Sequence, residues 1–212
     1  MSDAARPSTL SREFIGDLLA RTLVGALFLI LAISYLTEFR RTGRVTGLFF
    51  VVSEGLVVVF TILRRRASLV DRSIAATLLT MLSTFGPPLL RPWPGPSVVP
   101  DVVTAMLSSV GLIVVIFGKV TLGRSFGLVP ANRGVVARGP YSIVRHPIYS
   151  GYLLSHAAVL LAYPRPLNIA IVAIADFALV WRAMLEERIL ARDTAYQVYC
   201  QRVAWHLVPG VF

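Results

Sequence analysis

Long apolar runs alternate with short polar segments along the chain. A helix needs about 20 residues to cross the hydrocarbon core of a bilayer. The fifth run is short, and the turn Tyr163-Pro164-Arg165-Pro166 separates it from the sixth, so we expect these two to form a helical hairpin. The pattern predicts an all-α integral membrane protein of five to six transmembrane helices. Its candidate spans are residues 14–36, 45–63, 73–90, 99–120, 147–163 and 167–185.

Composition agrees with a lipid environment. Of the 212 residues, 56% are hydrophobic and 15% are charged, whereas about 25% are charged in a typical soluble domain. The single cysteine, Cys200, excludes an intramolecular disulfide. The apolar residues fall in continuous runs, which is the distribution expected when lipid is the solvent.

The net charge of +10 comes from arginines grouped between the apolar runs. This grouping is typical of cytoplasmic loops that face anionic membrane lipids, and we expect no nucleic-acid partner. Fifteen of the 21 basic residues fall in segments on the side of the N-terminus, and Arg21 lies within a span. The positive-inside rule then places the N-terminus, the 121–147 loop and the C-terminal tail in the cytoplasm. The opposite side holds Arg40, Arg41, Arg44, Arg91 and Arg165. Arginine greatly outnumbers lysine, which indicates a GC-rich and therefore bacterial source. We therefore expect the protein to lie in a bacterial inner (plasma) membrane.

The polar segment Gly139–Gly151 is a candidate binding site. It contains two glycines, two prolines, two tyrosines, an arginine and a histidine. Irregular chain at the edge of a bilayer is tolerated where protein covers it or where it lines a cavity. A helix that begins at Pro147 would present free amides and its positive dipole end to a carboxylate. Alternatively, His146 only caps that helix.

Four charged residues in or near the spans raise two interpretations each. Arg182 and Glu186 lie one helical turn apart. They form either a surface ion pair, or a pair that points into a cavity, where the arginine holds an anionic group and the glutamate faces a cationic cofactor. Glu54 and Asp176 lie inside apolar spans, where carboxylates are costly. They either serve function or hydrogen-bond to a neighbouring helix.

Other chemistries leave no signature in the sequence. His146, His156 and His206 lack the spacing of metal ligands, and Cys200 stands alone, so we expect no metal. The sequence contains no Gly-rich phosphate loop and no serine-nucleophile motif.

Several blocks in the second half resemble the isoprenylcysteine carboxyl methyltransferase family, within the wider group of membrane phospholipid methyltransferases. The resemblance covers about residues 110–212, and the blocks occur in the family's order. They are Leu122-Gly123-Arg124-Ser125-Phe126, Gly139-Pro140-Tyr141, Arg145-His146-Pro147-Ile148-Tyr149-Ser150-Gly151, Glu186-Glu187, Tyr196-Gln197-Val198-Tyr199 and Arg202-Val203.

The resemblance implies an enzyme that uses S-adenosyl-L-methionine. Together with the apolar pattern, we expect one domain with two parts: a four-span membrane region (residues 1–120), and a cofactor-binding loop, hairpin and tail (residues 121–212). By motif, Arg182 and Glu186 would be the catalytic pair, with Arg182 holding the methyl acceptor. The cofactor-binding residues would be Arg133, Gly134, Val135, Val136, Tyr141, His146, Pro147, Ile148, Tyr149, Glu186 and Glu187.

The favoured methyl acceptor is a lipophilic carboxylate, such as a prenylcysteine-like substrate, that enters from the bilayer and is gripped by Arg182. A phospholipid amine or a small thiol would keep the chemistry and change the acceptor. A nicotinamide-dependent membrane reductase is an alternative from another class, because membrane sterol reductases also resemble the C-terminal half of this chain. Those reductases normally carry more than four spans before that half. A non-enzymatic scaffold would give Arg182, Glu186 and His146 no reason to converge.

Overall fold

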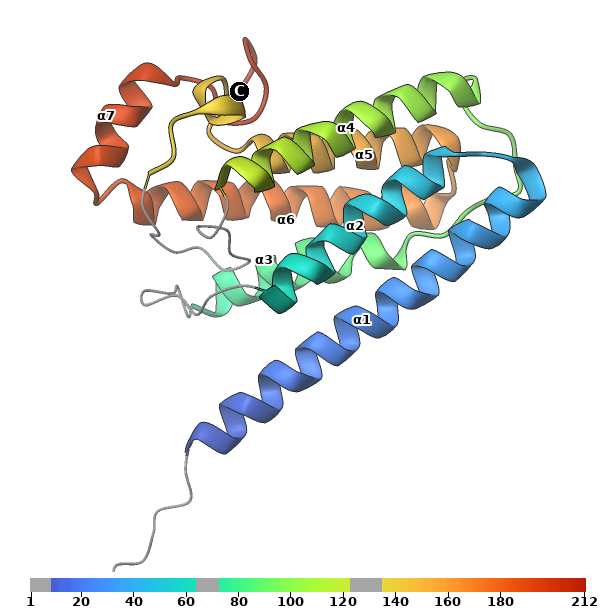
Figure 1. The fold of residues 1–212 in the computed structure, drawn as a ribbon, viewed down its shortest axis with the longest axis horizontal. Helices are drawn as coiled ribbons and strands as arrows, with labels where there is room; N and C mark the ends of the chain where they lie inside the picture. Colours follow the sequence, from blue (N-terminus) through green and yellow to red (C-terminus); the bar gives the residue numbers. More distant parts are fainter. Residues whose placement is uncertain (1–8, 64–72, 123–134) are drawn as a thin grey trace, which may run out of the picture.

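The computed structural model describes residues 9–63, 73–122 and 135–212 (Figure 1). All regular structure in these ranges is helical, which confirms the predicted all-α class. The α-helices are α1 (Thr9–Thr42), α2 (Thr46–Leu63), α3 (Ile74–Phe85), α4 (Asp101–Leu122), α5 (Pro147–Ala162), α6 (Pro166–Leu190) and α7 (Thr194–Arg202). Two 3₁₀ helices are η1 (Pro87–Leu89) and η3 (Gly139–Ser142).

Three of the described helices are long and apolar enough to cross a membrane: Arg21–Thr42 within α1, and the whole of α4 and α6. The apolar helices α2, α3 and α5 are shorter. The structure therefore supports a membrane-embedded helical protein, and a count of five or six spans stays a prediction.

The third predicted helix differs most from the structure. The apolar pattern predicts a span over residues 73–90, but α3 ends at Phe85 and the chain continues as η1. Pro87 and Pro88 follow Gly86 and have no N–H to continue the helical hydrogen bonds. With 12 residues, α3 is about 18 Å long, which is less than the roughly 30 Å of the hydrocarbon core.

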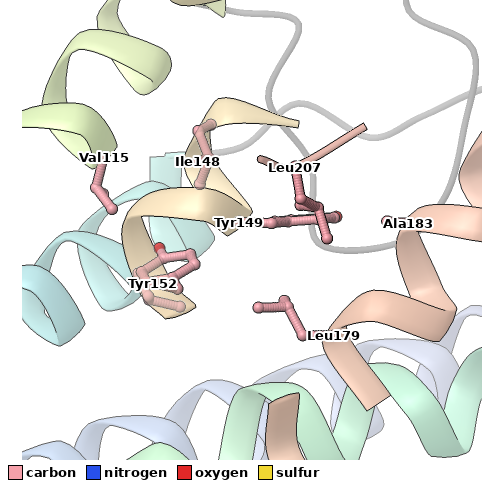
Figure 2. Close-up of a cluster of buried hydrophobic side chains, with 8 residues drawn as sticks. Val115, Ile148, Tyr149, Tyr152, Leu179, Ala183 and Leu207 are labelled. Carbon is pink, nitrogen blue, oxygen red and sulfur yellow. The ribbon is translucent and has the colours of Figure 1, made fainter. Parts of the chain in front are cut away.

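Helix α5 lies at the centre of the packing. It meets α4 where Gly111 and Gly151 face each other, and a Cβ on Gly151 would lie 2.7 Å from the Gly111 carbonyl oxygen. Small residues allow two membrane helices this close approach. α5 and α6 follow each other through the short turn at Tyr163, as the predicted hairpin requires. The α5 residues Ile148, Tyr149 and Tyr152 belong to a buried cluster with Leu179 of α6 (Figure 2).

The connections between helices separate into two ends of the bundle. At one end, Arg44 after α1 contacts both Asp101 (3.2 Å) and the carbonyl of Ala162 (3.3 Å). At the other end, the segment before α5 lies beside α7 and the C-terminus (Figure 1). The structure thus confirms that the polar segment and the tail meet, and the assignment of their end to the cytoplasm stays a prediction.

Candidate functional site

The chain turns sharply before α5. Gly139 has φ +58°, a left-handed conformation that favours glycine, and a Cβ there would lie 3.1 Å from the Thr121 hydroxyl. The following 3₁₀ turn buries Tyr141. His146 then adopts a non-helical conformation (φ −127°, ψ 60°) before Pro147, the first residue of α5. Proline disfavours helical geometry in the preceding residue, so the sequence itself fixes where α5 starts.

His146 occupies the N-cap position of α5, but its side chain makes no capping hydrogen bond. The structure thus confirms His146 as the N-cap residue, although its imidazole takes no part in capping. Its backbone amide donates to the carbonyl of His206 (2.9 Å). The imidazole is left to make side-chain contacts.

The C-terminal tail is hydrogen-bonded along the start of α5. Both backbone and side-chain groups of the 141–150 segment take part, so the tail is a fixed wall of the site. The bonds run from Arg145 N to Trp205 O (2.9 Å), from His146 N to His206 O (2.9 Å), from Ser150 Oγ to Leu207 O (2.6 Å), and from Tyr199 Oη to Tyr141 O (2.7 Å).

Glu187 joins α6 to both of these segments. Its Oε2 accepts from Arg145 Nη1 (2.9 Å), and its Oε1 bonds to His146 Nε2 (2.9 Å) and His206 Nδ1 (2.6 Å). Arg145 Nε also donates to the carbonyl of Val203 (2.8 Å). Both carboxylate oxygens of Glu187 therefore have hydrogen-bond partners within the protein. We call this set of bonds the Glu187 clamp, because it holds α6, the segment before α5 and the tail together.

Glu186, the neighbouring carboxylate, belongs to a different group. Tyr149 Oη donates to Glu186 Oε2 (2.9 Å) and accepts from Arg182 Nε (3.1 Å) and Nη2 (2.9 Å). Arg182 Nη1 donates to Ser83 Oγ of α3 (2.9 Å). Arg182 is only 4% exposed, so the surface ion-pair interpretation is wrong. Arg182 and Glu186 are linked through the phenol.

The aromatic rings extend this group toward the tail. The His146 imidazole stacks on the Tyr149 ring with centroids 5.3 Å apart and planes 6° apart. The Arg182 guanidinium carbon lies 4.8 Å from the Tyr149 centroid. In Figure 2, Tyr149 points between Leu207 of the tail and Ala183 of α6. Tyr149 therefore sits between the tail and the helix bundle.

A small pocket opens next to Arg182 and Tyr149. Four helices and η1 contribute to its wall, so it lies inside the bundle. The lining residues are Glu54, Val57, Ser83, Thr84, Pro87, Ile148, Tyr149, Tyr152, His156, Leu179 and Arg182.

The phenols on the tail side stay protonated at neutral pH. Burial raises the pKa of Tyr141 well above its usual value, and the negative charge of Glu186 raises it further. Burial raises the pKa of Tyr199 to about 12, although Arg145 opposes the shift. Both hydroxyl groups therefore keep their hydrogen, and Tyr199 donates its own to the Tyr141 carbonyl.

The other predicted cofactor-binding residues are distributed as follows. Val135 and Val136 are half-buried, and Val135 packs against the buried cluster around Tyr196 and Tyr199. Pro147 is buried, and Ile148 packs against Gly118 of α4 and lines the pocket. Arg133 and Gly134 lie outside the described residues.

Sequence reasoning missed several residues that complete the site. It did not single out Ser83 and Tyr152, because a serine and a tyrosine in apolar helices carry no spacing signal. It treated His206 only as a non-ligand of metals and Arg145 only as part of a motif. The resemblance implied that both Glu186 and Glu187 bind the cofactor, whereas the structure gives them different partners.

Comparison with known proteins adds one finding to this geometry. No curated protein matches the chain significantly. The model of the phospholipid methyltransferase family matches residues 102–196, which include α4, α5, α6 and the residues of the Arg182–Tyr149–Glu186 group. Residues 102–196 are therefore similar to the phospholipid methyltransferase family, a family of membrane methyltransferases that includes the isoprenylcysteine carboxyl methyltransferases.

Proposed function

We propose that this protein transfers a methyl group from S-adenosyl-L-methionine to a lipophilic acceptor, and that the acceptor is a carboxylate such as a prenylcysteine-like substrate. One observation carries the proposal: the buried guanidinium of Arg182 lines a pocket inside the helix bundle, one turn from Glu186 and beside the segment that the tail encloses. A polar cofactor and an apolar acceptor can then reach the same place from two directions.

The residues on the tail side have the chemistry to hold S-adenosyl-L-methionine. Glu186 makes one hydrogen bond within the described part of the chain, to Tyr149, so its carboxylate retains capacity for a cation. Its charge acts on Tyr141, so a carboxylate and two aromatic rings gather there, and cations bind to such groups. When bound, the cofactor supplies a methyl group on a positively charged sulfur.

Arg182 is oriented before any acceptor arrives. A guanidinium has five N–H groups, and Tyr149 and Ser83 take three of them. The two others can bond a carboxylate of the acceptor and hold it in place. The apolar residues Val57 and Leu179 on the pocket wall suit the acceptor's chain. Methyl transfer needs alignment and exclusion of water more than covalent help, and a buried pocket favours both.

The alternatives receive less support. An amine of a phospholipid would gain little from a buried guanidinium, and a small thiol would make no use of the apolar residues on the pocket wall. A nicotinamide-dependent reductase would share the position of the cofactor, but the family match to residues 102–196 favours methyl transfer. The two possibilities predict binding of different cofactors, and this binding can be measured directly.

Calorimetry on the protein purified in detergent tests the proposal. We expect micromolar binding of S-adenosylhomocysteine and no comparable binding of a nicotinamide dinucleotide. His146→Ala should weaken binding by at least about tenfold, or 1.4 kcal/mol, because it removes the ring stacked on Tyr149. Unchanged affinity in a folded His146→Ala variant would remove His146 from the site. No binding by the parent protein would refute the methyltransferase proposal.

A further inference from the structure

The pocket continues past Arg182 into a second polar region within the bundle. Glu54 of α2 and His156 of α5 both line it, and they are only 4% and 3% exposed. Asp176 of α6 lies directly behind His156. The proposed reaction uses none of these three residues, although charged groups at this depth are expensive to bury.

The imidazole of His156 is held in one orientation. Its Nδ1 bonds to Asp176 Oδ1 at 2.5 Å, and its ring stacks on Tyr152 with centroids 6.4 Å apart. An ionised carboxylate can only accept, so Nδ1 carries the proton, and in the neutral imidazole Nε2 is an acceptor. Nε2 is buried, and no described residue bonds to it. His156 therefore presents an unsatisfied acceptor at the pocket.

Glu54 supplies a second acceptor on the facing helix. Its carboxylate lines the pocket and is buried beside His156. The nearby cation is Lys119 of α4, whose Nζ lies over the Tyr152 ring, 5.3 Å from the centroid. If this polar group only fastened helices together, His156 Nε2 should be paired within the protein, as buried polar groups normally are.

We propose that the Glu54–His156 end of the pocket binds a hydrogen-bond donor, a hydroxyl or an ammonium group, carried on the chain of the methyl acceptor. The inference rests on the proposed function for the identity of the Arg182 end. From Tyr149 to His156 is seven residues of α5, which is about 10 Å along the helix. The acceptor is then a lipophilic acid with a second polar group about that far from its carboxylate, and not a plain hydrocarbon acid.

Binding measurements with simple probes test this inference without the reaction. The probes are dodecanoate, a series of hydroxydodecanoates with the hydroxyl at successive carbons, and the corresponding aminododecanoates. Affinities are measured by calorimetry in detergent, with and without S-adenosylhomocysteine. We expect one position of the polar group to improve affinity over dodecanoate by about tenfold or more, which corresponds to 1.4 kcal/mol.

Variants assign that preference to residues. Glu54→Gln should remove the preference for an aminododecanoate over dodecanoate, because the charge that attracts the ammonium group is lost. His156→Phe should remove the preference for the hydroxy acid, because the ring shape is kept and the acceptor nitrogen is lost. The matched control is Glu38→Gln, which changes another buried glutamate (5% exposed) that pairs with Arg41 outside the pocket. It should keep both preferences.

Each outcome has a definite meaning. A parent protein that binds all probes equally overturns the inference, as does a preference that survives both pocket variants. If His156→Phe unfolds, Asp176→Asn provides the second test, since it frees the orientation of the ring and should reduce the same preference. If the parent protein does not bind S-adenosylhomocysteine, the proposed function is refuted. The probe affinities measured without S-adenosylhomocysteine still test the present inference on its own.

Discussion

Tyr149 and Arg182 are joined by two hydrogen bonds and by contact of the guanidinium with the ring. The phenol oxygen accepts from Nε at 3.1 Å and from Nη2 at 2.9 Å, and the guanidinium carbon lies 4.8 Å from the ring centroid. This pair connects the first turn of α5 to the last part of α6. It fixes the direction of a buried positive charge at the boundary between the tail and the pocket.

Removing the phenol oxygen should separate acceptor binding from cofactor binding. Tyr149→Phe keeps the ring that stacks on His146 but leaves Arg182 without two of its hydrogen bonds. A hydrogen bond to a charged group is worth about 1.5–3 kcal/mol. We expect turnover to fall by at least about tenfold, with the affinity for S-adenosylhomocysteine nearly unchanged. A variant with parental turnover would show that the phenol oxygen does not position Arg182.

Arg182→Lys should be almost as damaging as Arg182→Ala. Lysine keeps the charge but cannot bond Tyr149 and Ser83 together while it also holds a carboxylate. Losing a buried charged partner costs about 2–5 kcal/mol, so turnover on the acceptor should fall roughly 30-fold or more. Cofactor affinity should survive in both variants. Assays on lipophilic carboxylates and amines, run beside cofactor titrations, measure this. Full activity of Arg182→Ala would favour amine or thiol acceptors.

The two adjacent glutamates should respond in opposite ways to the same substitution. Glu187→Gln weakens the clamp on Arg145, His146 and His206, so we expect a lower melting temperature and faster proteolysis of the tail. Glu186→Gln leaves that clamp intact, so it should weaken S-adenosylhomocysteine binding with little change in melting temperature. Thermal unfolding and calorimetry on both variants decide. If Glu187→Gln alone weakened the cofactor, the assignment of Glu186 to the cofactor would be reversed.

Labelling of cysteines in intact cells tests the orientation. A cysteine introduced at Ser97 lies at the end of the bundle where α3 and α4 are connected, and Cys200 lies at the opposite end with the tail. We expect a membrane-impermeant maleimide to label Ser97→Cys and not Cys200. Burial raises the pKa of Cys200, which slows its reaction, so Cys200 must be shown to label after solubilisation. The reverse pattern would place the site away from the cytoplasm.

Local features of the sequence were enough to predict most helix boundaries. The runs of apolar residues and the proline at position 147 give α5 and α6 to within a few residues, because proline geometry and hydrophobicity act over short distances along the chain. The prediction was wrong for the end of α3, where hydropathy continues across Gly86 although two prolines stop the helix. The sequence-based prediction followed the continuous hydropathy and gave too little weight to the two prolines.

The sequence by itself determined that this is a helical membrane protein, and it placed the residues 141–149, 182 and 186–187 among the candidates for the site. Only the tertiary structure decided the partners: Glu187 with His206, Arg182 with Ser83, and the pocket shared by Glu54 and His156. These residues are far apart in the chain, and their contacts depend on how each helix is rotated against its neighbours. Helical spacing fixes which side chains share one face of a helix, whereas packing between helices decides what that face meets.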